Sequence, residues 1–131
     1  MSSLGEEIAP DGYIDAVLSA YTGMPETPVK PTVGDRTTAR ALLERGVPLG
    51  TIHTALTLGS VRRLARPPDS PRLQPIHSLA YFLPVIDELL ETPLPQGYVA
   101  YLRTKLAKLA RGKLTRRQPR TGDRPENYVS S

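Results

Sequence analysis

The positions of proline constrain this chain strongly, because they limit how far any regular element can run. Fourteen of the 131 residues are proline, and most lie in short groups at 25–31, 67–75, 93–95 and 119–125. Proline lacks the backbone N–H and restricts the residue before it, so each group is expected to end a helix. The stretches between the groups are long enough to form helices.

Apolar residues recur at intervals of three and four in these stretches, which is typical of a helix buried on one side. In the first stretch Tyr13, Val17 and Tyr21 fall on one face. Helices are predicted at about 11–22, 34–45, 48–66, 76–91 and 96–112. Because no stretch alternates with period two, the predicted fold class is all-α. We expect a small bundle of about five helices with Pro-rich loops and a basic C-terminal tail.

The segment 76–91 is the most apolar of the predicted helices, and we expect it to lie at the centre of the bundle. Pro84 falls inside this segment. An interior proline removes the hydrogen bond to the carbonyl of Ala80, at a cost of about 3 kcal/mol unless the helix bends. A kink at Pro84 is therefore predicted.

The length fits a single domain, since one core usually serves about 100–150 residues. We assign residues 10–113 to a helical domain, residues 1–9 to a flexible N-terminus and residues 114–131 to a basic, disordered tail. The chain has no cysteine, and its first 20 residues contain acidic residues but no Lys or Arg. No apolar run approaches the roughly 18 residues of a membrane span. We therefore expect a cytoplasmic protein that does not associate with membranes.

Charge is distributed unevenly along the chain. Residues 103–131 contain nine Lys or Arg and two Asp or Glu, whereas residues 1–102 contain eight and eleven. Clustered cations attract polyanions at long range, whatever fold presents them. The asymmetry therefore indicates a class of partner, of which DNA is the main candidate, and not a reaction.

The last predicted helix combines this charge with an aromatic residue. Tyr101 shares one face of this helix with Lys105 and Lys108. Lysines that contact phosphates give salt-sensitive affinity without sequence preference, and an aromatic ring among them can stack on an unpaired base. The predicted DNA-binding residues are Tyr101, Lys105, Lys108, Arg111, Lys113, Arg116 and Arg117, with Arg62 and Arg63 as a second patch. The alternative is a solubilising tail, or cations favoured at the negative end of the helix dipole.

Residues 41–56 have the outline of a helix-turn-helix, with glycine at the turn. In such a motif the second helix would offer Gly50, Thr51, His53 and Thr54 to base edges. None of these is Arg, Lys, Asn or Gln, the residues that pair bidentately with bases. A structural corner between two helices shows the same Gly-x-Pro pattern, and we favour that interpretation.

No catalytic or metal-binding pattern is found in the sequence. His53 and His77 are 24 residues apart, and neither has a second ligand three or four residues away. The densest acidic group is Asp87, Glu88 and Glu91. Such a group is more often a solvated face than a catalytic pair. The sequence therefore predicts no enzyme, no cofactor and no metal.

Three segments carry a resemblance to known proteins: Gly46-Val-Pro-Leu-Gly-Thr-Ile52, Pro75-Ile-His-Ser-Leu-Ala-Tyr-Phe-Leu-Pro-Val-Ile86 and Gly97-Tyr-Val-Ala-Tyr-Leu-Arg103. They resemble helical proteins encoded on bacterial mobile elements. They are also similar to the C-terminal helical domain of DnaD-type replication-initiation and primosome proteins, over about half the chain. The resemblance implies a protein that binds DNA and recruits replication machinery without catalysis. The winged-helix N-terminal domain of that family has no counterpart here.

Two functions follow from these observations. The first is a non-enzymatic DNA-binding accessory protein for replication or mobility of a genetic element, which binds mainly through phosphates and without sequence specificity. Replication or transposition proteins would then be further partners. The alternative is a protein-interaction adaptor, a helical docking or dimerisation module with an incidental basic tail. A homo-oligomer is compatible with either function.

Overall fold

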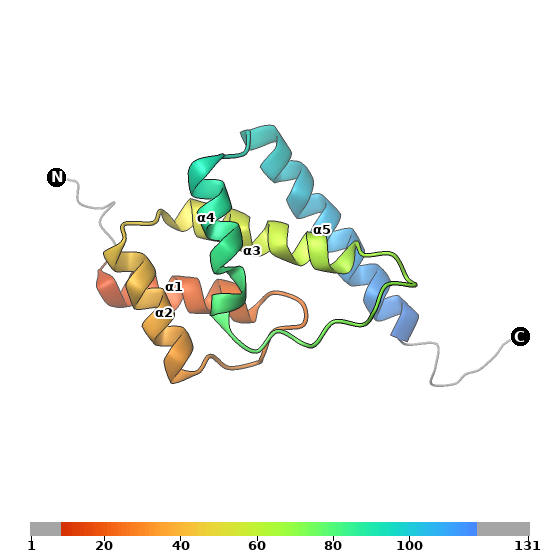
Figure 1. Ribbon diagram of the computed structural model, residues 1–131, viewed down its shortest axis with the longest axis horizontal. Helices are drawn as coiled ribbons and strands as arrows, with labels where there is room; N and C mark the ends of the chain where they lie inside the picture. Colours follow the sequence, from red (N-terminus) through yellow and green to blue (C-terminus); the bar gives the residue numbers. More distant parts are fainter. Residues whose placement is uncertain (1–8, 118–131) are drawn as a thin grey trace, which may run out of the picture.

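The computed structural model describes residues 9–117, with side chains described as far as residue 112. Within these residues it contains five α-helices, one 3-10 helix and no strand, so the all-α prediction is confirmed (Figure 1). The elements are α1 (Pro10–Thr22), α2 (Val33–Glu44), α3 (Leu49–Leu64), η2 (Leu79–Phe82), α4 (Leu83–Glu91) and α5 (Gln96–Arg117). None of the helices in the described part of the chain combines the length and apolar character needed to cross a membrane.

The central helix is α3, which packs against α1, α4 and α5 (Figure 1). Every residue from Ala55 to Val61 is buried, so this stretch is covered on all sides. Small residues make such close packing feasible: a Cβ atom added to Gly59 would lie 2.9 Å from the Phe82 ring. The prediction that residues 76–91 form the central helix is therefore wrong. The most apolar segment is not the central helix, because a helix that three other helices approach closely needs small side chains.

Residues 76–91 do not form one kinked helix. The chain is irregular up to Ser78, whose Oγ accepts a hydrogen bond from the backbone N–H of Ala80 at 3.0 Å. After the short η2, α4 begins at Leu83 and places Pro84 in its first turn. The N–H that proline lacks would have no partner within the helix at that position. The predicted kink is therefore absent, because the helix starts just before the proline.

One buried carboxylate connects the start of α2 with the start of η2. Asp35 Oδ2 accepts from the backbone N–H of Thr32 at 3.0 Å, and the Thr32 hydroxyl accepts from Asp35 N–H at 3.1 Å. This reciprocal arrangement is a capping box. The second oxygen, Asp35 Oδ1, accepts from the N–H of Leu79 at 2.9 Å. Asp35 thereby determines where the chain turns into η2 and α4.

The last helix is longer than predicted. We expected a helix to about 112 and a tail from 114, but α5 continues to Arg117. Residues 114–117 therefore belong to the helix, and the predicted boundary is wrong. The remaining predicted tail, residues 118–131, and most of the predicted flexible N-terminus, residues 1–8, lie outside the described residues.

Candidate nucleic-acid interface

Four arginines outside α5 each contact a carboxylate from a different element. Their nitrogen-to-oxygen distances are 3.3 Å for Arg36–Asp15, 2.9 Å for Arg45–Asp87, 2.7 Å for Arg62–Glu88 and 2.6 Å for Arg63–Glu26. Three of these pairs are half exposed, and the fourth is buried on the arginine side. The positive charge of these arginines is largely neutralised within the fold.

Arg63 is a structural residue, and its assignment to the DNA-binding surface is wrong. Its side chain is 4% exposed, so it cannot reach a phosphate. It donates hydrogen bonds to Glu26 Oε1 at 2.6 Å, to the Tyr81 hydroxyl at 3.3 Å and to the carbonyl of Gln74. Burial lowers the pKa of Arg63, but the bonds to Tyr81 and Glu26 raise it more, so the net direction is upward. Arg63 therefore joins the Pro-rich loops at 25–31 and 67–75 to α3.

Arg62 lies at the surface but is paired. Its two terminal nitrogens donate to the two oxygens of Glu88 at 2.9 and 2.7 Å. This hydrogen bonding raises the pKa of Arg62 and lowers the pKa of Glu88. Arg62 therefore contributes no net charge to a binding surface while Glu88 is ionised.

One side of α5 carries a row of aromatic and basic residues, which we call the α5 stripe: Tyr98, Tyr101, Lys105 and Lys108. Steps of three and four residues place these side chains one above the other along the helix. Leu102, one turn beyond Tyr98, is buried on the adjoining, core-facing side, with Val99, Leu106 and Leu109 partly buried beside it. The core-facing side of α5 is thus apolar.

Three basic side chains of α5 differ from the four paired arginines described above. Among the described residues, no acidic side chain pairs with Arg103, Lys105 or Lys108. Arg103 and Lys108 are exposed, and Lys105 is half-buried. Arg111 is also exposed, and the continuous helix carries Lys113, Arg116 and Arg117 beyond it. The predicted cations of the C-terminal helix therefore belong to one continuous helix.

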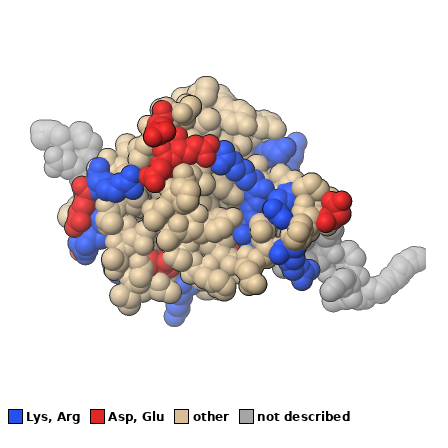
Figure 2. Space-filling model, in the orientation of Figure 1, with Lys and Arg blue, Asp and Glu red and all other residues tan. Residues whose placement is uncertain are grey.

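Acidic and basic side chains lie next to one another on the face of the molecule shown in Figure 2. Acidic side chains gather over the C-terminal part of α4, where Asp87, Glu88 and Glu91 lie. Basic side chains form a band over the C-terminal half of α3 and the middle of α5 (Figures 1 and 2). The acidic group includes two members of the ion pairs above, Asp87 and Glu88, so its observed role is structural.

The two tyrosines of the α5 stripe contact each other. Their ring centroids are 5.6 Å apart and the ring planes are tilted by 31°. Tyr98 is 45% exposed and Tyr101 is 51% exposed. The Nζ atom of Lys105 lies 5.9 Å from the Tyr101 ring centroid, within the range of a weak cation–π contact.

The corner between α2 and α3 does not present a recognition helix. Gly46 has a φ of 76°, and the hydroxyl of Tyr13 donates to the carbonyl of Val47 at 2.7 Å. The Gly46 conformation makes the turn, and the hydrogen bond to buried Val47 ties the turn to α1. Gly50 is exposed, but Thr51, His53 and Thr54 are half-buried and line hollows that α3 shares with its neighbours, so the first turns of α3 offer little free surface to a DNA groove. The structural-corner interpretation accounts for this geometry.

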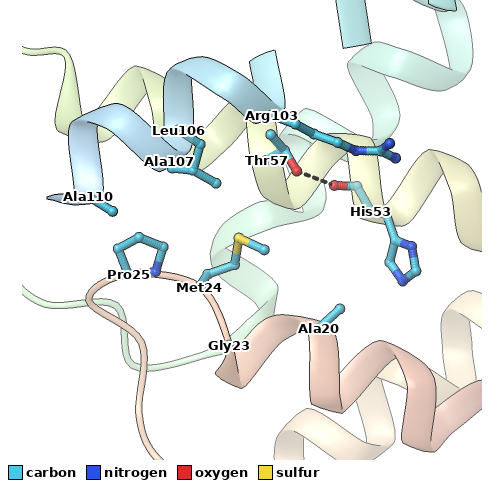
Figure 3. Close-up of a pocket in the computed structure, with 10 residues that line it drawn as sticks. All are labelled: Ala20, Gly23, Met24, Pro25, His53, Thr57, Arg103, Leu106, Ala107 and Ala110. Atoms are coloured by element: carbon cyan, nitrogen blue, oxygen red, sulfur yellow. Dashed lines mark hydrogen bonds between the residues drawn. The ribbon is translucent and has the colours of Figure 1, made fainter. Parts of the chain in front are cut away.

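A hollow lies between the end of α1, the middle of α3 and α5 (Figure 3). Its volume is about 570 Å³, and its lining residues are Ala20, Gly23, Met24, Pro25, His53, Thr57, Arg103, Leu106, Ala107 and Ala110. Arg103 and His53 lie at one end, and the rest is mainly apolar (Figure 3). Arg103 also lines a second hollow of about 320 Å³ between α3, α4 and α5.

Two residues of this region were not in the predicted site. Tyr98 forms a pair with Tyr101, and Arg103 borders both hollows. Tyr98 could have been found from the sequence, because it precedes Tyr101 by three residues on a predicted helix. Arg103 could not, because its position depends on how α5 crosses α3.

The described residues offer no metal centre: within residues 9–117 no three acidic or histidine side chains gather closely enough to hold an ion. Comparisons with known protein families, with curated proteins and with solved structures give no match for this chain.

Proposed function

We propose that this protein binds DNA without sequence specificity, through phosphate contacts made by the basic residues of α5. The observation that carries the proposal is the contrast in charge pairing. Four of the seven arginines that precede α5, Arg36, Arg45, Arg62 and Arg63, contact carboxylates, whereas Arg103, Lys105 and Lys108 have no carboxylate partner among the described residues. Unpaired cations spaced along a helix suit the regular negative charge of a nucleic-acid backbone.

The resemblance of residues 45–108 to DnaD-type and mobile-element proteins suggests where such binding would be used. We propose an accessory role in replication or mobility of a genetic element, without catalysis. The first turns of α3 are half-buried, so they are poorly placed to contact base edges. This supports binding through phosphates, which does not depend on base sequence.

The test is a fluorescence-anisotropy titration of labelled DNA at about 50 and 200 mM salt, at which phosphate-dominated binding differs strongly. The variant replaces Lys105 and Lys108 with Gln, and Lys30→Gln serves as control because Lys30 is an exposed lysine outside α5. We expect the double variant to bind about tenfold more weakly at the lower salt, with a salt slope reduced by about 2. DNA binding that is absent, or equal in the wild type and the double variant, would overturn the proposal.

The hollow between α1, α3 and α5 favours a second candidate, a protein-interaction adaptor. Its walls are mostly apolar, and no acidic residue lines it, so it suits a partner helix with apolar side chains and a carboxylate near Arg103. Ala107→Tyr would fill the hollow, and Ala100→Tyr is the control because Ala100 lies outside the lining. A wild-type dimer in sedimentation velocity that only Ala107→Tyr disrupts, with no DNA binding, would support this candidate over the first.

A further inference from the structure

We infer that Tyr98 and Tyr101 form a stacking platform for unpaired bases, so that the α5 stripe prefers single-stranded nucleic acid to duplex. The inference rests on the proposed function, because the phosphate contacts must first bring a strand to α5. It adds the class of ligand that this surface selects.

The exposure of these two rings distinguishes them from the tyrosines of the core. Tyr13 is 7% exposed and donates a hydrogen bond to a backbone carbonyl, and Tyr21 is fully buried. Tyr98 and Tyr101 each keep about half of their surface in solvent, although they are large apolar groups. Core packing therefore does not account for them, whereas aromatic rings exposed beside cations are typical of single-strand binding surfaces.

The geometry of the pair indicates how a base would bind. A base held between two parallel rings would need them about 6.8 Å apart, twice the 3.4 Å spacing of stacked bases. The two centroids are 5.6 Å apart with a 31° tilt, so the rings already contact each other. A base would therefore stack on an outward-facing ring surface and extend the tyrosine pair.

The lysines lie where the adjoining phosphates would be. Lys105 is one helical turn beyond Tyr101, and its Nζ lies 5.9 Å from that ring. A flexible lysine can leave this weak contact and bind a phosphate while a base covers the ring. In a duplex the faces of interior bases are covered by their neighbours, so only the phosphate contacts would form.

The experiment compares an oligothymidylate with a duplex of equal length at one salt concentration. The test variant carries Tyr98→Leu and Tyr101→Leu, which keep an apolar side chain on the helix but remove the rings. The matched control carries Tyr98→Phe and Tyr101→Phe, which keep the rings. Thermal unfolding of all three proteins reports whether the fold is retained. Because the chain has six Tyr and no Trp, the tyrosine quenching of the wild type in excess of that of the Phe variant reports stacking on Tyr98 and Tyr101.

We expect the wild type and the Phe variant to prefer the single strand, with tyrosine quenching in the wild type alone, because the Phe variant lacks both stripe tyrosines. We expect the Leu variant to lose about tenfold in single-strand affinity and almost none for duplex. Equal affinity for both ligands, or a Leu variant with wild-type single-strand affinity, would overturn the stacking inference and leave phosphate binding standing. Failure of the wild type to bind either ligand would overturn the proposed function, and the inference with it.

Discussion

The loop junction around Arg63 and the outer side of α5 both concentrate positive charge, but they use it differently. At the junction a guanidinium is buried, and its hydrogen bonds to Glu26, Tyr81 and Gln74 hold two loops on α3. On α5, Lys108 is exposed and Lys105 half-buried, and neither has a carboxylate partner in the described part of the chain. The comparison teaches that the number of cations in a segment does not reveal a binding surface; the carboxylates and carbonyls that surround them decide it.

The largest effect should come from breaking the junction. Arg63→Ala removes the buried guanidinium that binds Glu26 and the Gln74 carbonyl, and we expect it to lower the free energy of unfolding by about 3–5 kcal/mol. Urea denaturation followed by circular dichroism measures this loss. The folded fraction should bind DNA with unchanged affinity, because Arg63 does not reach the surface.

The control for this change is Arg66→Ala, one turn further along. Arg66 is exposed and donates a single hydrogen bond, to the carbonyl of Pro71 at 2.8 Å. Its loss should cost less than about 1 kcal/mol. Equal stability of the Arg63 and Arg66 variants would contradict the assignment of Arg63 to the interior.

A second prediction for the interior concerns Tyr21, whose buried hydroxyl has no hydrogen-bond partner among the described residues. Burial, together with the negative charge of Asp35, raises the pKa of Tyr21 from 10.0 to about 12. Below pH 10 both the folded and the unfolded chain keep the proton, so the full stability is present. Between pH 10 and 12 only the unfolded chain loses it, and the wild type should lose about 2–3 kcal/mol more than Tyr21→Phe.

The measurement is urea denaturation of the wild type and Tyr21→Phe across this pH range, in which the remaining tyrosines act as a common background. Near pH 7 the variant should be as stable as the wild type or up to about 1 kcal/mol more stable, since no hydrogen bond is lost. A parallel pH dependence of the two proteins would show that Tyr21 ionises normally in the folded state.

A smaller effect is expected when Arg62 is released from its ion pair and becomes free to bind DNA. Glu88→Gln removes the charge that neutralises Arg62, so we expect DNA affinity to rise about two- to fivefold, with a salt slope steeper by about 1. Glu91→Gln is the matched control: it removes the same charge from α4 but frees no arginine. Anisotropy titrations that give equal gains for both variants would mean that overall charge, and not the release of Arg62, sets the affinity.

Much of the fold could be predicted from local sequence, because it follows from local chemistry. Groups of proline limit the helices, and the spacing of apolar residues shows their buried faces. The errors concerned Pro84, the centre of the bundle and the end of α5. The start of α4 depends on Asp35, which binds Leu79 N–H from 44 residues away. The burial of α3 depends on Phe82 packing over Gly59. No local pattern contains either contact.

By itself the sequence determined the all-α class, the approximate helices and the concentration of basic residues towards the C-terminus. Only the tertiary structure decided which of those basic residues are used internally. Arg62 and Arg63 are neighbours of the same residue type, yet one lies at the surface and the other is buried. Consecutive helical residues point about 100° apart. Their partners, Glu88 and Glu26, lie 26 and 37 residues away in opposite directions along the chain, and only folding brings them together.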